Sequence, residues 1–371
     1  MGSLTRKWRA FRAASAQAAL ETGKSPWAQL AEIMRLRRGR GALGMREYYE
    51  VHAYDAPTTQ AQDAFVGWRM ALRLQAALSS PGWDVASIDK FVFYSLCEAW
   101  GLPSPALRAI FTPDGARHGH RIPTLVTLDD VRGFLAAPDA PFPLFVKPVH
   151  ALTGLGGAGI AGYDLARDRV RLINGREATL EETIRPHAHS ARYWPSATIF
   201  QDLLRPHPEV ARRCGARLCT VRIVVLLEKA GPLVVHALFR VAAGNNMVDN
   251  LRHGALGNSC GPVEVATGKV LRQVAYVDAC EREITQHPDT GEPITGFVLP
   301  DWEAGIALCK RAALCFGGFR LQGWDLALTD RGPTLVELNS PFDILGSQAL
   351  TREGIWDARV DRVLAELGAK P

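Results

Sequence analysis

The chain has 371 residues and a mass of 40.5 kDa, enough to bury a large core and to divide into two or three subdomains. Apolar residues make up 47% of it and no run of about 18 apolar residues occurs, so the sequence predicts a soluble protein without a membrane span. The net charge of +5 is modest and no basic stripe with interleaved aromatics is present, which excludes nucleic acid as the expected partner and favours small anionic ligands.

The cysteines and the N-terminus indicate a compartment. Seven cysteines, an odd number without CxxC or Cys/His metal spacing, predict reduced thiols in a cytoplasmic protein. The first residues lack an uninterrupted apolar segment, so we expect no signal peptide. They are rich in Arg and hold no acid before Glu21, a pattern typical of a basic amphipathic helix and also of a transit peptide. The oligomeric state stays open, and an oligomer is compatible with the sequence.

In chain order, residues 1–84 predict a helical region with helices near 5–20, 25–38 and 58–79. We expect the next helix to begin after Asp89 as its N-cap and to end before Gly101 and Pro103. Strands and helices then intermix without regular alternation: strands near 144–149, 168–174 and 198–204, a long hairpin over 219–243, and helices near 127–136, 301–316 and 353–368. This intermixing predicts an α+β fold rather than a doubly wound parallel sheet.

The segment 144–160, LFVKPVHALTGLGGAGI, joins an apolar strand to a glycine loop. The strand carries Lys147, and glycines follow at 154, 156, 157 and 159. Glycines let successive backbone N–H groups approach an anion closely, so the pattern indicates a phosphate cradle with a fixed positive charge beside it. It matches neither the Walker pattern nor a good Rossmann fingerprint. A plain flexible hairpin is the alternative, and the segment alone does not decide between the two.

Two arginines lie inside apolar strands of the predicted hairpin over 219–243. Arg222 belongs to the first strand and Arg240 to the second. A half-buried Arg needs an anionic partner, and its planar guanidinium matches phosphate or carboxylate bidentately. The partner is a ligand anion in one interpretation, and a structural carboxylate such as Asp249 or Glu264 in the other.

The stretch GWDLALTDRGPTLVELNS, residues 323–340, predicts a β-hairpin that holds a metal. With a loop of Asp330, Arg331 and Gly332, Thr329 faces Pro333 and Asp325 faces Glu337. Strand side chains alternate, so Asn339 shares the face of Glu337. Opposed carboxylates repel unless a cation lies between them, and hard oxygen donors without His or Cys suit Mg²⁺. The alternative is a solvated hairpin face with scattered acids.

In this order, the Lys–glycine cradle, the Arg-bearing sheet and the Asp…Glu-x-Asn hairpin resemble the ATP-grasp superfamily over about residues 85–350. The chain is most similar to the sugar-transfer-associated ATP-grasp family, through RGRGALGMREYYEVHAYD (38–55), TVRIVV (220–225), FRVAAGNNMVDN (239–250) and the hairpin 323–340. The resemblance implies an ATP-grasp fold, in which two α+β subdomains grip ATP. The implied division is an N-terminal helical extension (1–84), an ATP-grasp domain (85–350) with a glycine-lid subdomain (about 140–200) and a metal-binding subdomain (about 205–350), and a C-terminal helix (351–371).

The resemblance also assigns roles to single residues. It implies ATP-phosphate lysines at Lys90 and Lys147, the second followed by a lid that contains Gly154, Gly156 and Gly157. It implies a hinge that holds adenine at Gln201, Asp202, Leu203 and Leu204. The catalytic residues it implies are Arg222, Arg240 and Lys147, with Asp249 and Asn250 on the acceptor or phosphate side. The cofactors it implies are ATP and Mg²⁺, two ions with Mn²⁺ as a substitute, and the metal ligands are Asp325, Glu337 and Asn339.

Two departures from the family pattern concern the acceptor side. Cys219 stands where the family usually has Asn before Thr-Val-Arg, and Leu251-Arg252-His253 stands where it usually has a Gly-Gly pair. These two changes leave the nucleotide site intact but put the acceptor side in doubt. At the hinge, Asp202 occupies a place where the superfamily often has Glu, and whether this shorter acid reaches adenine or ribose stays open.

The expected function is a Mg-ATP-dependent ligase that joins a small-molecule carboxylate to an amine, or to a thiol, through an acyl phosphate. Such an enzyme would serve polysaccharide or secondary-metabolite assembly. Its catalysis is positioning and charge neutralisation, which agrees with the absence of a nucleophile signature in the sequence. One alternative is a kinase of the same fold that phosphorylates a sugar or another small-molecule hydroxyl, with Asp249 or His253 as base. The other is a non-catalytic nucleotide-binding module.

Overall fold

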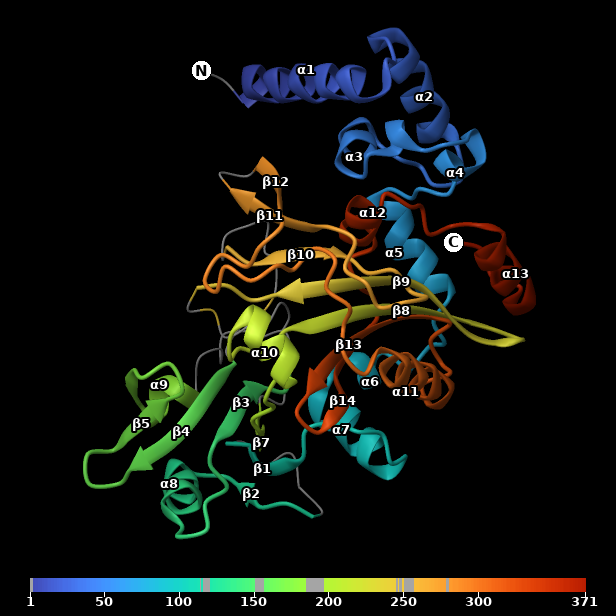
Figure 1. Ribbon diagram of the computed structural model, residues 1–371. Coiled ribbons are helices and arrows are strands. Elements are labelled where there is room, and N and C mark those ends of the chain that lie inside the picture. The colour runs from blue at the N-terminus through green and yellow to red at the C-terminus, as the bar shows by residue number, and fades with distance from the viewer. Residues whose placement is uncertain are drawn as a thin grey trace.

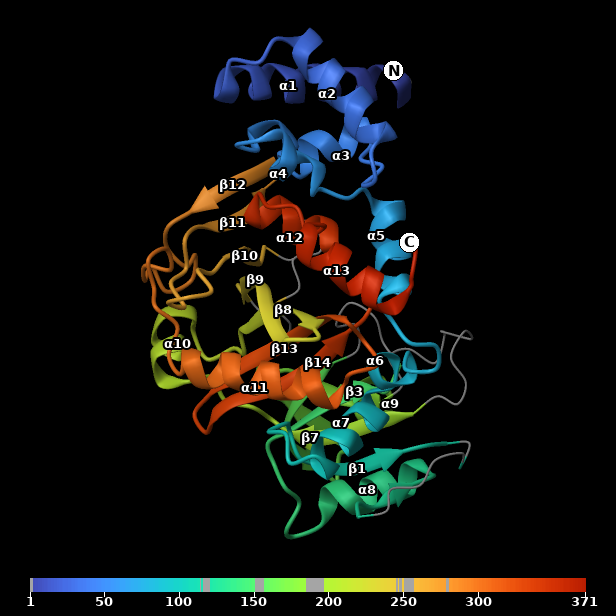
Figure 2. The same ribbon diagram turned by 90° about the vertical axis from the view of Figure 1, so that its right-hand side faces the viewer.

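The computed structural model describes residues 3–113, 115, 121–150, 157–184, 197–244, 246, 249, 257–277 and 280–371. Its elements form three parts stacked along one direction, as both ribbon views show (Figures 1 and 2). The first helices of the N-terminal region occupy one end, a large sheet with its covering helices lies in the middle, and a second sheet lies at the other end. The α+β fold is confirmed. In the part of the chain described here, no helix is long and apolar enough to cross a membrane.

The N-terminal region is helical, as predicted. Its elements are α1 (Ser3–Thr22), α2 (Pro26–Arg38), α3 (Met45–Glu50), the short 3-10 helix η1 (Ala53–Asp55), α4 (Thr59–Asp63) and α5 (Trp68–Ala77). The single helix expected over 58–79 is wrong, because the chain breaks into α4 and α5 at Gly67. The Gly67 N–H donates to the carbonyl of Gly41 over 2.8 Å, and a Cβ at Gly67 would lie 2.8 Å from the Ala42 carbonyl oxygen. Because the two backbones approach so closely, only glycine fits at position 67, and the helix is interrupted there.

The first sheet has the order β2-β1-β7-β3-β4-β5-β6. Its strands are β1 (Leu107–Phe111), β2 (Thr124–Leu125), β3 (Leu144–Pro148), β4 (Ala158–Asp164), β5 (Arg169–Leu172), β6 (Glu177–Thr179) and β7 (Thr198–Asp202). Only the pairing of β1 with β2 is parallel among the described strands. Helices α8 (Leu128–Ala136) and α9 (Leu180–Ile184) pack on it around Val146, Ile160 and Phe200, which are fully buried. This sheet delivers Lys147 and Gln201.

The second sheet is antiparallel throughout and has the order β12-β11-β10-β9-β8-β13-β14. Its strands are β8 (Thr220–Glu228), β9 (Gly231–Val241), β10 (Ser259–Pro262), β11 (Gln273–Val277), β12 (Cys280–Ile284), β13 (Leu321–Thr329) and β14 (Gly332–Asn339). Helix α11 (Trp302–Cys315) covers one face, while α5, α12 (Ile344–Thr351) and α13 (Ala358–Leu367) cover the other. Because both faces are covered, every residue of β13 is buried.

Helix α7 (Lys90–Ala99) links the two sheets, following the short α6 (Val85–Ile88); α10 (Pro208–Cys214) lies between β7 and β8. Asp89 caps α7 as predicted, since its carboxylate accepts a hydrogen bond from the Val92 N–H over 3.0 Å. One face of α7 packs on the core beneath β13 and β14 through Phe93, Tyr94 and Cys97. Helix α7 therefore carries its first residues to the junction of the sheets.

Candidate active site

The hairpin β13–β14 places Asp325 directly opposite Glu337, as predicted. The predicted loop is wrong, however: Thr329 pairs with Gly332, so the connection holds only Asp330 and Arg331. A bulge between Asp325 and Leu326 inserts the extra residue Val336 on β14, because Leu326 pairs with Leu335. The bulge compensates for the shorter loop and returns the two carboxylates to the same rung.

Asp325 is held by two arginines of the same sheet. Its carboxylate accepts hydrogen bonds from Arg222 Nε over 2.6 Å and Arg222 Nη2 over 3.2 Å, and Arg240 Nη1 lies 2.9 Å away. Burial by itself would raise the pKa of Asp325, but the charges and hydrogen bonds of Arg222 and Arg240 outweigh it and lower the pKa to about 2. Asp325 is therefore ionised at any physiological pH. The cation beside it in this structure is guanidinium.

The ion-pair chain continues from Arg240 to Asp249. Arg240 Nη2 donates to Asp249 over 2.8 Å, and the other Asp249 oxygen accepts from the N–H of Thr220 over 2.7 Å and from its hydroxyl. Burial raises the pKa of Asp249, while the charge of Arg240 works against that rise. For Arg240, the interpretation with a structural carboxylate as partner therefore agrees with the structure, and that carboxylate is Asp249. Asp249 thus holds Arg240 in place, and Arg240 in turn contacts Asp325.

Glu337 meets a cation from the other side of the hairpin. Lys90 Nζ, at the start of α7, lies 3.0 Å from Glu337 Oε1. Lys90 is 7% exposed, whereas the Glu337 side chain is 28% exposed, so the carboxylate is the more open of the two groups. Asn339 donates from Nδ2 to Asp325 over 3.3 Å, which turns its Oδ1 away from that carboxylate. Glu337 and Asn339 therefore lie next to Asp325 on the neighbouring strand of the hairpin.

Tyr94 joins the two sheets, and the sequence interpretation missed it. Lys147 Nζ on β3 donates to the Tyr94 hydroxyl over 2.6 Å and lies 4.8 Å from the centre of its ring. The hydroxyl donates in turn to the carbonyl of Val336 on β14 over 2.6 Å. Tyr94 follows Lys90 by four residues, so both share one face of α7. The spacing from Lys90 could have identified Tyr94 as a site residue. In the sequence, however, Tyr94 is equally typical of an apolar helix face that packs on the core.

Lys147 has an unusually low affinity for its proton. It is 9% exposed, and burial lowers its pKa to about 7; the charge of Glu337 opposes this shift and that of Lys90 adds to it. An anionic group placed beside Lys147 would restore the charged form. The resemblance assigned both lysines to ATP phosphates: Lys147 contacts Tyr94, and Lys90 contacts Glu337 on β14.

The predicted hinge lies at the end of β7. The Gln201 side chain is buried, and its Oε1 has no hydrogen-bond partner, which leaves an acceptor that an amine donor would satisfy. Asp202 is paired bidentately with Arg108 over 2.6 and 2.8 Å. The Leu203 N–H donates to the Pro143 carbonyl over 3.3 Å, and Leu204 is half-buried. Arg108 is therefore a competitor for any ribose hydroxyl that approaches Asp202.

Part of the glycine loop lies outside the described residues. Gly154 and Gly156 lie in that part. Asn250 and Leu251-Arg252-His253, on the predicted acceptor side, also lie outside the described residues. Gly157 is described: a Cβ there would lie 2.6 Å from the Phe145 ring, so a side chain does not fit. Cys219, the other departure, is buried and follows Cys214.

The metal ligands that the resemblance implied fit Mg²⁺ by their chemistry. Asp325, Glu337 and Asn339 offer carboxylate and amide oxygens on neighbouring rungs of one hairpin, and Asp325 needs no deprotonation. Among the described residues no group of three or more His, Cys, Asp or Glu side chains could hold a metal, so phosphate oxygens and water would have to complete the shell. Asp325 already accepts N–H groups of Arg222, Arg240 and Asn339. A metal would compete with these donors for its oxygens.

Comparison with known proteins assigns the family. The family described as sugar-transfer associated ATP-grasp matches residues 84–362, three quarters of the chain. That span starts just before α6 and ends within α13, so it contains both sheets and every residue of the site. No curated protein matches the chain.

Solved structures with a similar arrangement are distant. The L-amino acid ligase from Bacillus licheniformis has 13% identity and a TM-score of 0.41, covering 76% of this chain and 51% of its own. The D-alanine–D-alanine ligase from Bacillus anthracis has 13% identity and a TM-score of 0.41; the match covers 81% of this chain and 77% of the ligase. The D-Ala:D-Ser ligase VanG from Enterococcus faecalis has 11% identity and a TM-score of 0.42, with 78% and 63% covered. The chain spans about half the length of the first of these, and likeness of this size carries no information on substrates.

Proposed function

The chain belongs to the sugar-transfer-associated ATP-grasp family, and from that premise we propose that it is a Mg-ATP-dependent ligase. The proposed reaction joins a small-molecule carboxylate to an amine. The carboxylate attacks the γ-phosphorus of ATP, the bond to the β,γ-bridging oxygen breaks, and ADP leaves. The amine nitrogen then attacks the acyl carbon, phosphate leaves, and the amine loses a proton.

One observation carries this proposal: four basic side chains and two opposed carboxylates meet where β3 and α7 approach strands β8, β9, β13 and β14. Lys90 contacts Glu337, Arg222 and Arg240 contact Asp325, and Lys147 reaches β14 through Tyr94. Phosphoryl transfer between two anions needs charge neutralisation and alignment more than it needs a nucleophilic side chain. This cluster has the composition for that task.

Each side chain has a proposed part. Lys90 and Lys147 bind the phosphates, and Gln201 accepts a hydrogen bond from the adenine amine at its unpartnered Oε1. Arg222 and Arg240 hold the transferred phosphoryl group and the donor carboxylate. Asp325, Glu337 and Asn339 would hold Mg²⁺, two ions in our proposal, which when bound would neutralise the charge of the phosphates. Gly157 and the neighbouring loop would exclude water from the acyl phosphate.

The kinase alternative depends on a base near the acceptor. Asp249, one of the two candidates, is bonded to Arg240 and to Thr220, and both partners stabilise its charged form. Both oxygens of Asp249 are thus occupied by hydrogen bonds within the protein, although burial raises the pKa of this carboxyl. His253, the other candidate, lies outside the described residues, so the choice between ligase and kinase depends on the reaction product.

A hydroxylamine trap tests the proposal. The purified protein would receive Mg·ATP, one member at a time of a panel of amino acids, sugar acids and short peptides, and hydroxylamine. We expect ADP release together with a hydroxamate of the matching acid. A stable phosphate ester would instead identify a kinase, and Mg·ATP binding without turnover across the panel and a parallel panel of sugars would identify a non-catalytic module.

A further inference from the structure

Helix α2 exposes one apolar stripe while it buries another face. Gln29, Ile33 and Leu36 are buried, with Ile33 and Leu36 in a small core beneath α1 and α3. On the other face Trp27 is 80% exposed, Leu30 37% and Met34 39%. These three residues recur at intervals of three and four, so they form one continuous stripe along the helix. A stripe of large apolar side chains turned to water indicates an interaction surface.

The stripe is set among positive charges. Arg37 and Arg38 follow Met34 by three and four residues, which places them on the same side of α2 one turn further on, and both are exposed. Residues 1–40 contain nine Lys or Arg and only two Glu, a net charge of +7, whereas the whole chain carries +5. The rest of the protein is thus slightly acidic. The positive charge belongs to the end that exposes the stripe.

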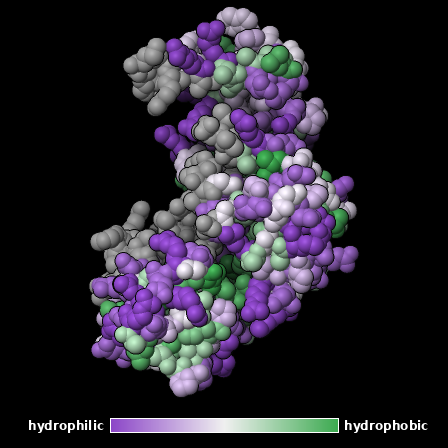
Figure 3. Space-filling model, turned by 60° about the vertical axis from the view of Figure 1, so that its left-hand side comes forward, coloured by the Kyte–Doolittle hydropathy of each residue, from purple (hydrophilic) through white to green (hydrophobic). Residues whose placement is uncertain are grey.

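Helix α1 adds to the same end. Trp8 is 62% exposed and stacks on Phe11 with the ring centres 5.5 Å apart, and Leu20 is 83% exposed. The ribbon views place α1 and α2 together at one end of the molecule, away from both sheets (Figures 1 and 2). Figure 3 shows apolar side chains among hydrophilic ones at this end. A surface here leaves the junction of the two sheets uncovered.

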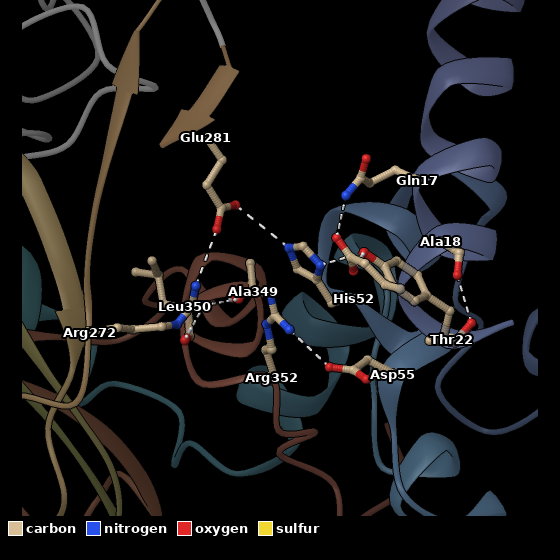
Figure 4. A network of polar contacts seen from close by, with 12 residues as sticks. Gln17, Ala18, Thr22, His52, Asp55, Arg272, Glu281, Ala349, Leu350 and Arg352 are labelled. Atoms are coloured by element: carbon tan, nitrogen blue, oxygen red, sulfur yellow. Dashed lines mark hydrogen bonds and ion pairs between the residues drawn. The ribbon is translucent and has the colours of Figure 1, made fainter. Parts of the chain in front are cut away.

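The helical end is fixed to the second sheet and its helices. Arg352 contacts Asp55 over 2.9 Å, and His52 Nε2 lies 3.6 Å from Glu281, which also meets Arg272 (Figure 4). The backbone N–H and carbonyl of Val66 both bond to the Gln348 side chain at 3.0 Å. A partner bound to α2 would therefore set the orientation of the whole enzyme.

We propose that the Trp27–Leu30–Met34 stripe docks on the surface of a membrane that contains anionic lipids. The indole and the two apolar side chains would enter the boundary between headgroups and acyl chains, while Arg37, Arg38 and the exposed Arg9 and Arg12 of α1 pair with lipid phosphates. Nucleic acid would use the charge and could stack on the Trp27 ring, but it has no use for the exposed Leu30 and Met34 side chains. A protein groove would use the stripe but has no need for positive charge spread over two helices. The combination favours the lipid surface.

Vesicle flotation of the full-length protein tests this inference. We expect the protein to float with vesicles of phosphatidylcholine mixed with phosphatidylglycerol, and to stay behind with phosphatidylcholine alone. Binding should fall as salt rises, because the charges are screened. The triple variant Trp27→Gln, Leu30→Gln, Met34→Gln should lose at least tenfold in apparent affinity, and the double variant Arg37→Gln, Arg38→Gln several-fold.

Matched controls separate the stripe from general stickiness and from misfolding. Leu165→Gln with Leu314→Gln removes two leucines that are each 60% exposed, and Arg171→Gln with Arg176→Gln removes two exposed arginines of the first sheet. Both controls should float like the unchanged protein, and all variants should keep its melting temperature. In addition, Trp27→Phe should still float while quenching of tryptophan fluorescence by brominated acyl chains decreases.

Three results would overturn the inference. The first is equal flotation of the triple variant and the unchanged protein. The second is failure of the unchanged protein to float with anionic vesicles at low salt. The third is a dimer in light scattering that the triple variant splits, since the stripe would then cover a second copy of this chain.

Discussion

The Nζ of Lys147 lies 2.6 Å from the hydroxyl oxygen of Tyr94, and this hydrogen bond connects β3 of the first sheet to α7. The same hydroxyl donates to the Val336 carbonyl, next to Glu337. Lys147 thus donates to a neutral hydroxyl. Its burial is the main cause that lowers its pKa, to about 7.

Nucleotide affinity should depend on pH through Lys147. Above about pH 7 the free protein holds Lys147 neutral, and phosphates favour the charged form, so binding must take up a proton. The Kd for ATP should therefore rise by up to about tenfold per pH unit above pH 7, and level off below it. Calorimetry at alkaline pH in buffers of different ionisation enthalpy should show the proton uptake. Lys147→Ala should abolish it and raise the Kd by roughly one to two decades; a pH-independent Kd in the unchanged protein would contradict the account.

Tyr94→Phe should weaken ATP binding without a large change in fold. The variant keeps the ring beside Lys147 but removes the acceptor of its ammonium group, so the pKa of Lys147 should fall further. We expect an ATP Kd about tenfold higher at alkaline pH, the size of one charge-assisted hydrogen bond, and a smaller difference below pH 7. Tyr163→Phe, which removes a hydroxyl bonded to Asp168 in the first sheet, is the matched control and should bind ATP normally. An equal loss at all pH values would show that Tyr94 acts only on packing.

The two carboxylates of the hairpin should differ in their effect on stability. Asp325→Asn leaves Arg222 and Arg240 buried beside a neutral amide and should cost about 3–5 kcal/mol in the free energy of unfolding. Glu337→Gln should cost clearly less, because its side chain is 28% exposed and the amide oxygen can still accept from Lys90. Both variants should lose ATP turnover. Denaturant unfolding measures the difference, and equal losses would mean that Glu337 is a structural residue.

Arg222 should compete with Mg²⁺ for Asp325. Its two N–H groups occupy both carboxylate oxygens, so Arg222→Gln frees acceptor sites for the ion. We expect this variant to bind Mg²⁺ more tightly than the unchanged protein in calorimetry without nucleotide, although its turnover falls. The control is Arg108→Gln, which releases Asp202 at the hinge and should leave Mg²⁺ affinity as it was. Weaker Mg²⁺ binding in Arg222→Gln would remove Asp325 from the metal ligands.

The sequence predicted the pairing of Asp325 with Glu337 because side-chain alternation in a hairpin depends on local spacing. It did not predict the loop length, since the bulge at Val336 compensates within the same strand. It left the partner of Arg222 open, because Arg222 and Asp325 are 103 residues apart and strand order decides their contact. The role of Tyr94 depends on a similar long-range contact, with Lys147 from the other sheet.

The predicted subdomain boundaries and the roles of the site residues stay predictions. Residues 84–362 match the family, which agrees with an ATP-grasp domain preceded by helices. The acceptor side depends on Asn250 and on Leu251-Arg252-His253, outside the described residues. The substrate panel therefore includes amines and thiols.

The fate of the carboxylate oxygen tests the proposed ligase most directly. A donor acid found in the hydroxylamine screen would be supplied with heavy oxygen in its carboxylate, together with Mg·ATP and the amine. An acyl phosphate transfers one of these oxygens to the released phosphate, so mass spectrometry should find the label in phosphate at one atom per ADP formed. Unlabelled phosphate, with ADP still produced, would contradict the proposed chemistry.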